Sequence, residues 1–186
     1  WLKLPDYEEI SNGRPDEIRI ALDALGVRTI EECQLLEAKC ILPEVRNIAE
    51  NYDSLAELIY DGQNLGFALD ERGQGMPHFM EKFAAALEYE DCRTLADAVD
   101  ISENLSCYDF IPEADFHDFG MRELQQRGYF HGESFLADCF DFEVYAADLL
   151  ENQGFVLAKD EKSYITRNDT PFVPVHDHPE SQQMLM

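Results

Sequence analysis

The sequence predicts an α+β fold, and three observations support this. Apolar residues recur at helical spacing in several separate segments of the chain. Short alternating or aromatic-rich runs that end at proline or glycine predict strands in the first and last thirds. The 12 Phe and 8 Tyr supply core-forming side chains that a disordered acidic chain lacks. We therefore expect a small N-terminal sheet with a helix, a central helical bundle and a C-terminal α/β part.

The N-terminal subdomain is expected to span residues 1–50. Residues 1–4 alternate like a strand and end at a proline. A proline opens a helix over residues 15–25, and Gly26 is its C-terminal stop. Residues 34–42 predict a second strand. These elements predict a small sheet covered by one helix.

The central subdomain, residues 51–103, is expected to be helical. Ser54 begins an S-x-x-E pattern, which is the capping box that opens a helix. Thr94 begins a similar pattern before a second apolar run, and residues 79–87 carry a helical stripe between them. Short helices joined by turns predict a small bundle.

The C-terminal subdomain, residues 104–167, is expected to mix helices and strands. Residues 105–111 are aromatic-rich and predict an extended segment that ends at a proline. Helices are expected over residues 115–126 and 141–152, each followed by a glycine. Residues 155–166 predict a terminal hairpin.

Patterns typical of catalysis or metal binding are weak. The Pro-rich segment 168–186 has no periodicity and is expected to be disordered, so no rigid element fixes the His-Asp-His cluster at 176–178. His117 lies in an acidic run, Cys139 lacks a nucleophile signature, and the Gly-Gln-Gly at 73–75 is not a phosphate-binding loop. We expect a protein without enzymatic activity, bound metal or cofactor.

The chain carries 39 Asp and Glu against 14 Lys and Arg, a net charge of −25. Such a surface is repelled by nucleic acid and by anionic membranes, and it attracts a basic groove on another protein. No apolar run approaches the roughly 18 residues that cross a bilayer, and no secretion signal opens the sequence. The five cysteines contain no CxxC pair, which favours reduced thiols in the cytoplasm.

The acids are concentrated in two stretches without Lys or Arg, from Arg93 to Arg122 and from Arg127 to Lys159. Ordinary surface acidity, or a salt-loving source, is the alternative explanation. Mixed surfaces, however, normally use ion pairs that these stretches lack. The candidate interaction surface consists of Asp97, Asp100, Glu103, Asp109, Glu113, Asp115, Asp118, Glu133, Asp138, Glu143, Asp148 and Glu151.

Three motifs carry a resemblance to a known family. The sequence DFEVYAADL at 141–149, followed by Gly-Phe at 154–155 and the hairpin, resembles the ending of ArdA-type antirestriction proteins of conjugative and other mobile elements. WLKLP at 1–5 is similar to that family's W-f-x-x-P strand, and SLAEL at 54–58 to its S-[IL]-x-E-L helix opening. The resemblance spans about residues 1–166.

The resemblance implies an elongated protein of three subdomains that lacks the family's first strand, dimerises and acts in the cytoplasm of a bacterial host. It further implies a DNA mimic, which imitates the phosphates of bent B-DNA and occupies the DNA groove of type I restriction-modification enzymes. Acids at i and i+3 or i+4 of a helix lie about 5–6 Å apart. Alternate base pairs rise about 7 Å along one DNA strand, so helical carboxylates can stand in for phosphates.

Two alternatives and one further expectation complete the hypothesis. The main alternative is an acidic adaptor module of a mobile element that binds another basic protein, such as a relaxase or an RNA-guided nuclease. A metal-dependent hydrolase using His117 or His176 is the third. We also expect a homodimer, because an aromatic edge strand can pair with its copy across a two-fold axis. The interface residues would be Leu105, Cys107, Tyr108 and Phe110.

Overall fold

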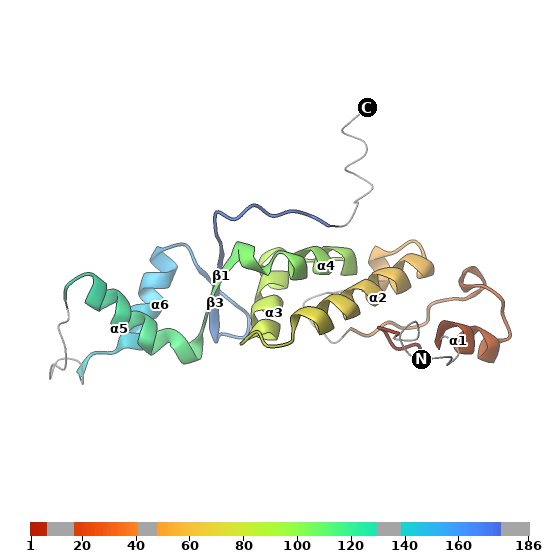
Figure 1. Ribbon diagram of the computed structural model, residues 1–186, viewed down its shortest axis with the longest axis horizontal. Helices are drawn as coiled ribbons and strands as arrows, with labels where there is room; N and C mark the ends of the chain where they lie inside the picture. Colours follow the sequence, from red (N-terminus) through yellow and green to blue (C-terminus); the bar gives the residue numbers. More distant parts are fainter. Residues whose placement is uncertain (7–16, 41–47, 130–138, 176–186) are drawn as a thin grey trace, which may run out of the picture. The chain divides into compact units, whose positions relative to one another are not determined.

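A computed structural model describes residues 1–6, 17–40, 48–129 and 139–175 and has helices together with a small antiparallel sheet (Figure 1). The α+β prediction is confirmed. The helices are α1 (Glu17–Leu25), α2 (Leu55–Arg72), α3 (Phe79–Tyr89), α4 (Leu95–Glu103), α5 (Phe116–Gln126) and α6 (Phe142–Asn152). The strands are β1 (Tyr108–Pro112), β2 (Val156–Leu157) and β3 (Ser163–Arg167). Short 3₁₀ turns cover Ile30–Glu32, Ile48–Asn51, Leu105–Cys107 and Glu113–Asp115.

The chain divides into two compact units rather than three subdomains and a tail. Unit 1 consists of Trp1–Leu105 together with the segment from Phe172, and unit 2 consists of Ser106–Pro171. The border between the two units lies between Leu105 and Ser106. Residues 1–50 belong to unit 1 together with the helices that follow, and α1 contributes no buried residue.

Unit 1 is built on α2, α3 and α4, with α2 and α3 both packed against α4. Its core contains fully buried Phe83 and Leu87 of α3, and Phe79 stacks on Phe83 at 6.1 Å between ring centroids. The predicted helix openings are confirmed. The Ser54 hydroxyl accepts the Glu57 N–H, and Thr94 begins a complete capping box at the start of α4.

A buried carboxylate joins α2 to the start of α4. Asp61 of α2 is 5% exposed and accepts a hydrogen bond of 2.8 Å from the Tyr52 hydroxyl. The same hydroxyl oxygen accepts the main-chain N–H of Leu95, the first residue of α4, at 2.9 Å. Burial and the hydrogen bond to Asp61 raise the pKa of Tyr52 above its ordinary value. Tyr52 thus satisfies a charged acceptor and a helix N-terminal donor together.

The two strands predicted before residue 50 are absent from the described residues 1–6 and 33–40; residues 41 and 42 lie outside the description. The N-terminal segment instead packs on α2. A Cβ on Gly62 would lie 2.7 Å from a Leu4 methyl carbon, and one on Gly66 would lie 2.6 Å from Cγ of the rigid Pro5 ring, so these glycines allow the close approach of the segment. The alternation of residues 1–4 predicts a strand paired with another strand, but these residues contact α2 instead.

The N-terminal segment is also held by a side-chain amide. The Asp6 N–H donates to Gln63 Oε1 at 2.7 Å, and Gln63 Nε2 donates to the Asp6 carbonyl at 2.5 Å. A carboxamide on α2 therefore satisfies both main-chain groups of one residue, as a neighbouring strand would.

Unit 2 has a three-stranded antiparallel sheet in the order β1-β3-β2. The predicted hairpin is confirmed as β2 and β3, and β1 pairs along the other side of β3 with Phe110 opposite Ile165. The helices α5 and α6 lie side by side (Figure 1) and pack together. Their apolar faces form a core with Tyr164 of β3. Its buried members are Phe116, Phe119, Ala146, Leu149, Leu150 and Tyr164.

The segment predicted to be disordered, 168–186, is ordered in its first part. The Asn168 N–H donates to the Cys107 carbonyl at 2.9 Å, which continues the pairing of β3 with β1. Residues 172–175 then belong to unit 1. The prediction of disorder is therefore wrong for residues 168–175. Prolines prevent a helix there, but the extended main chain is held by hydrogen bonds to other parts of the chain. Residues 176–186 lie outside the described part.

We expect Tyr52→Phe to destabilise unit 1 by about 1–3 kcal/mol, because Asp61 and the Leu95 N–H each lose a partner. The raised pKa in the folded state means that the stabilisation is fully present below pH 10 and is lost as the pH rises above 10. Chemical denaturation between pH 7 and 11 measures both effects, and Tyr129→Phe, at a residue that is 76% exposed, is the control. Equal stabilities of the two variants would contradict the assignment.

Candidate functional site: the acidic surface

The acids of the candidate surface fall in different parts of the fold. Asp97, Asp100 and Glu103 lie on α4 in unit 1, whereas all the others belong to unit 2. Glu133 and Asp138 are outside the described residues.

The three acids of α4 hold the fold together. Asp97 closes the capping box by accepting the Thr94 N–H at 3.1 Å. Glu103 pairs with Arg72 at the end of α2. Asp100 is only 2% exposed, so its prediction as an exposed surface acid is wrong. Sequence periodicity could not reveal this, because the segment that covers Asp100 lies far away along the chain.

The acids around the start of α5 are exposed. Glu113, Asp115 and Asp118 all face solvent, and Asp118 lies 3.3 Å from the ring of His117. Asp115 occupies the N-cap position without a side-chain capping bond. Asp109 of β1 accepts a hydrogen bond from the Asn168 side chain at 3.0 Å. This end of α5 therefore presents carboxylates beside the positive end of a helix dipole.

The acids of α6 are also exposed. Glu143 and Asp148 have no ion pair with Lys or Arg in the part of the chain that the structure describes. Glu151 accepts the Tyr164 hydroxyl at 2.9 Å. Burial of Tyr164, together with this bond, raises the pKa of its phenol. Asp148 and Glu151 are three residues apart, so both lie on one face of the helix.

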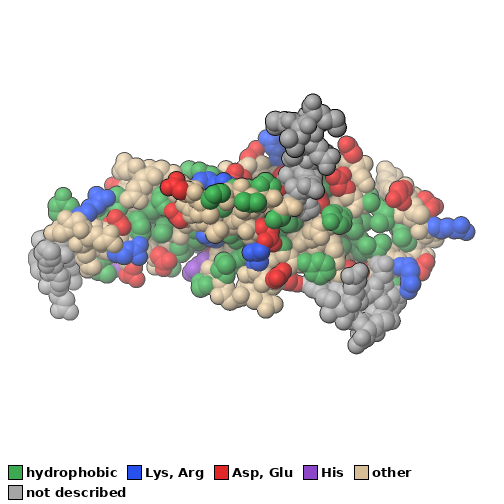
Figure 2. Space-filling model, turned by 45° about the horizontal axis from the view of Figure 1, so that its top comes forward, with side chains coloured by type: hydrophobic (Ala, Val, Ile, Leu, Met, Phe, Trp, Pro, Cys, Tyr) green, Lys and Arg blue, Asp and Glu red, His purple; other side chains and the backbone are tan. Residues whose placement is uncertain are grey.

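Unit 2 carries fourteen Asp and Glu against five Lys and Arg, a net charge of −9. On the face that Figure 2 shows, acidic side chains occur among basic and apolar ones. Exposed acids without a Lys or Arg ion pair occur in both units among the described residues, and those of α5 and α6 belong to the unit of net charge −9. We call Asp115, Asp118, Glu143 and Asp148 the α5–α6 acids.

The side chains predicted to form a dimer interface are mostly buried within the chain. Leu105, Cys107 and Tyr108 are 5%, 1% and 1% exposed, and only Phe110 is half-buried. Tyr108 packs under Arg167, whose guanidinium donates to its hydroxyl at 3.2 Å. Because these three side chains are buried within the chain, the prediction that they contact a partner is wrong. The strand β1 is nevertheless at an edge of the sheet.

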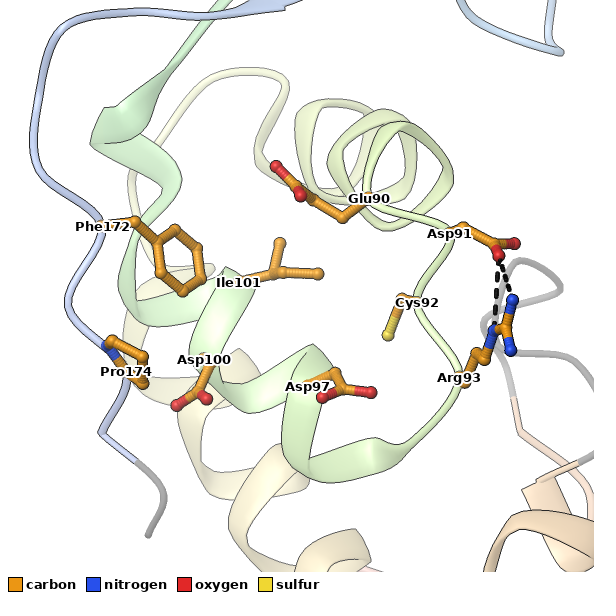
Figure 3. Close-up of a pocket in the computed structure, with 9 residues that line it drawn as sticks. All are labelled: Glu90, Asp91, Cys92, Arg93, Asp97, Asp100, Ile101, Phe172 and Pro174. Carbon is orange, nitrogen blue, oxygen red and sulfur yellow. Dashed lines mark hydrogen bonds and ion pairs between the residues drawn. The ribbon is translucent and has the colours of Figure 1, made fainter. Parts of the chain in front are cut away.

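A shallow pocket of about 290 Å³ lies beside α4 in unit 1 (Figure 3). Asp91 forms an ion pair of 2.8 Å with Arg93 at its margin, and Cys92 lies deeper. Burial, and secondly the charge of Asp97, raise the pKa of the Cys92 thiol to about 12, so this sulfur is not a nucleophile at neutral pH. The lining residues are Glu90, Asp91, Cys92, Arg93, Asp97, Asp100, Ile101, Phe172 and Pro174.

The described residues contain no group of three or more His, Cys, Asp and Glu side chains placed to hold a metal ion. His117 packs against the Phe142 ring at 5.0 Å. Cys139 is exposed, whereas residues 176–178 lie outside the description. Gly73 is the C-cap of α2 and begins a turn.

Sequence reasoning missed two functional carboxamides, Gln63 and Asn104. Each satisfies both main-chain groups of a distant residue, Asp6 for Gln63 and Val173 for Asn104. Asn104 follows α4 directly, where an asparagine is usually explained as a helix terminus. No local pattern distinguishes that role from binding a segment 69 residues away.

Comparison of the chain with protein-family models, with curated proteins and with solved structures gives no significant match. None of the helices in the described ranges is long and apolar enough to cross a membrane.

The division between structural and surface acids predicts that two substitutions change stability by different amounts. Asp97→Ala removes half of a capping box and should cost about 0.5–2 kcal/mol of stability. Asp148→Ala removes an exposed charge from a crowded negative surface and should change stability by less than about 0.5 kcal/mol. Urea denaturation followed by circular dichroism measures both. A loss at Asp148 as large as that at Asp97 would show that the α6 acid is also structural.

Proposed function

We propose that this chain is a non-enzymatic DNA mimic of the antirestriction type, which inhibits a type I restriction-modification enzyme by occupying its DNA groove. One observation carries the proposal: the α5–α6 acids are exposed and have no Lys or Arg partner among the described residues, in a unit of net charge −9. The ArdA-type motifs of the sequence support the same function.

The helix pair offers a rigid support for these carboxylates. The opposite faces of α5 and α6 are buried in one core through Phe119, Ala146 and Leu150, so the acidic side chains project from elements whose backbones are fixed. Fixed charges lose little entropy when a partner binds. A basic DNA groove would release its counterions onto them as it does onto phosphates, which makes binding strongly dependent on salt.

The remaining parts of the proposal follow from this role. We infer a protein of the bacterial cytoplasm, where its target acts, without direct binding to nucleic acid or membrane. We also infer a homodimer that pairs through the main chain of β1 at the sheet edge. The side chains of Leu105, Cys107 and Tyr108 support that strand from inside the molecule.

Two variants of equal charge test the proposal. The first neutralises the α5–α6 acids as Asp115→Asn, Asp118→Asn, Glu143→Gln and Asp148→Asn. The matched control neutralises four exposed acids of unit 1, Glu50→Gln, Asp53→Asn, Asp70→Asn and Glu71→Gln. Exposed charge pairs contribute about 0.2–1 kcal/mol each, so the first variant should bind its target on the order of tenfold more weakly or worse.

The measurement is inhibition of ATP-dependent DNA cleavage by a purified type I enzyme at several salt concentrations. Full inhibition by the first variant would show that the α5–α6 acids do not bind the DNA groove. Equal losses in both variants would mean that net charge alone matters. Duplex DNA should compete with the wild-type chain for the enzyme. A complex that forms but is insensitive to DNA would favour the adaptor function.

A further inference from the structure

Residues 172–175 bind to unit 1 as an extended segment. The Asn104 side chain accepts the Val173 N–H through Oδ1 and donates from Nδ2 to the Val173 carbonyl, both at 2.9 Å. Two residues later, the Val175 N–H donates to Asp100 Oδ1 at 2.7 Å. We call residues 172–175 the strap. Asp100 and Asn104 are four residues apart, so both lie on one face at the C-terminal end of α4.

The bonds recognise a main chain rather than particular side chains. Residues i and i+2 of an extended chain turn the same edge towards a neighbour, and here they are Val173 and Val175. Pro174 lies between them, at a position where no N–H is needed. The valine side chains are 62% and 58% exposed, so the groups that unit 1 holds are the peptide N–H and C=O groups.

The groups on α4 are built into the core. Asp100 is 2% exposed and Asn104 is 8% exposed. Asp100 lies in the last turn of its helix, where the negative end of the helix dipole disfavours a carboxylate. Burial of this charge requires donors from outside the helix, and the Val175 N–H supplies one. The orientation of Asn104 is fixed as well, because Nδ2 also donates to the Asp100 carbonyl at 2.8 Å.

The strap contributes one wall of the pocket beside α4. In Figure 3 the rings of Phe172 and Pro174 lie on the strap side, and Ile101 and Asp97 lie on the helix. The side chains at alternate positions of the strap thus border the pocket while the intervening residues provide the main-chain bonds. The combination is typical of proteins that recognise an extended peptide.

We propose that Asp100 and Asn104 form a peptide-binding site on α4, and that residues 172–175 are its ligand within the same chain. The site takes an extended segment with free N–H groups at two alternate positions and a proline between them. It binds such a segment as a separate molecule when the chain's own strap is unable to dock. This site is independent of the α5–α6 acids.

The test uses the full chain and a fluorescent peptide of residues 169–175, DTPFVPV. Val173→Pro with Val175→Pro removes both N–H donors from the strap and should free the site. Val173→Ala with Val175→Ala keeps the donors and is the matched control. A tethered strap competes at an effective concentration in the millimolar range. The proline variant should therefore bind the peptide at least tenfold more tightly than the wild type or the alanine variant.

Two further measurements identify the recognised groups. Asn104→Ala in the proline variant should weaken peptide binding about tenfold, since both bonds to Val173 are lost. A peptide with an N-methyl group at the position of Val173 should fail to bind the same folded protein. In the wild type, hydrogen exchange should show protected amides at Val173 and Val175.

Absence of peptide binding to a proline variant whose circular dichroism is that of the wild type would overturn the proposal. Equal binding of the methylated and unmethylated peptides would do so too, because it would mean that the main-chain N–H is not recognised. Unprotected amides at Val173 and Val175 would show that the strap is not a ligand of α4.

Discussion

A shortage of cations governs how this chain satisfies its carboxylates. With 39 acids and 14 bases, most carboxylates lack a possible Lys or Arg partner. Those nearest the core therefore use neutral donors, which offset the cost of removing a charge from water. In the described residues these pairs include Tyr52 with Asp61, Thr94 with Asp97, Val175 with Asp100 and Tyr164 with Glu151. Tyrosine hydroxyls and main-chain N–H groups thus replace the ion pairs of a balanced protein.

This constraint decides which acids are available to a partner. A carboxylate that holds a helix cap or a buried hydroxyl cannot turn outward without loss of stability, and Asp61, Asp97 and Asp100 are of this kind. Glu143 and Asp148 are exposed and have no ion pair with Lys or Arg among the described residues. The distinction is chemical and does not follow from charge density along the sequence. It is the reason that the acids of α4 contribute to the fold, whereas those at the start of α5 and on α6 carry the proposed interaction surface.

The features that could be predicted from the sequence are the local ones. Helix openings at Ser54 and Thr94 depend on a bond between residues three apart, and the structure contains both. The hairpin of β2 and β3 is local as well. The pairing of β1 with β3, the packing of Leu4 on Gly62 and the docking of the strap join residues more than 50 positions apart, where no periodicity constrains the partner. The prediction of Asp100 as a surface acid failed for this reason.

The two kinds of carboxylate also respond differently to salt. Exposed acids repel one another across the surface, and counterions screen this repulsion within about 10 Å at 0.1 M salt. Buried carboxylates such as Asp100, held by a main-chain N–H at 2.7 Å, are screened much less. Added salt therefore stabilises the fold by relieving surface repulsion while it weakens attraction to any basic partner. The negative charge that opposes folding at low salt is the same charge that favours binding there, so rigid helices with apolar cores are needed to carry it.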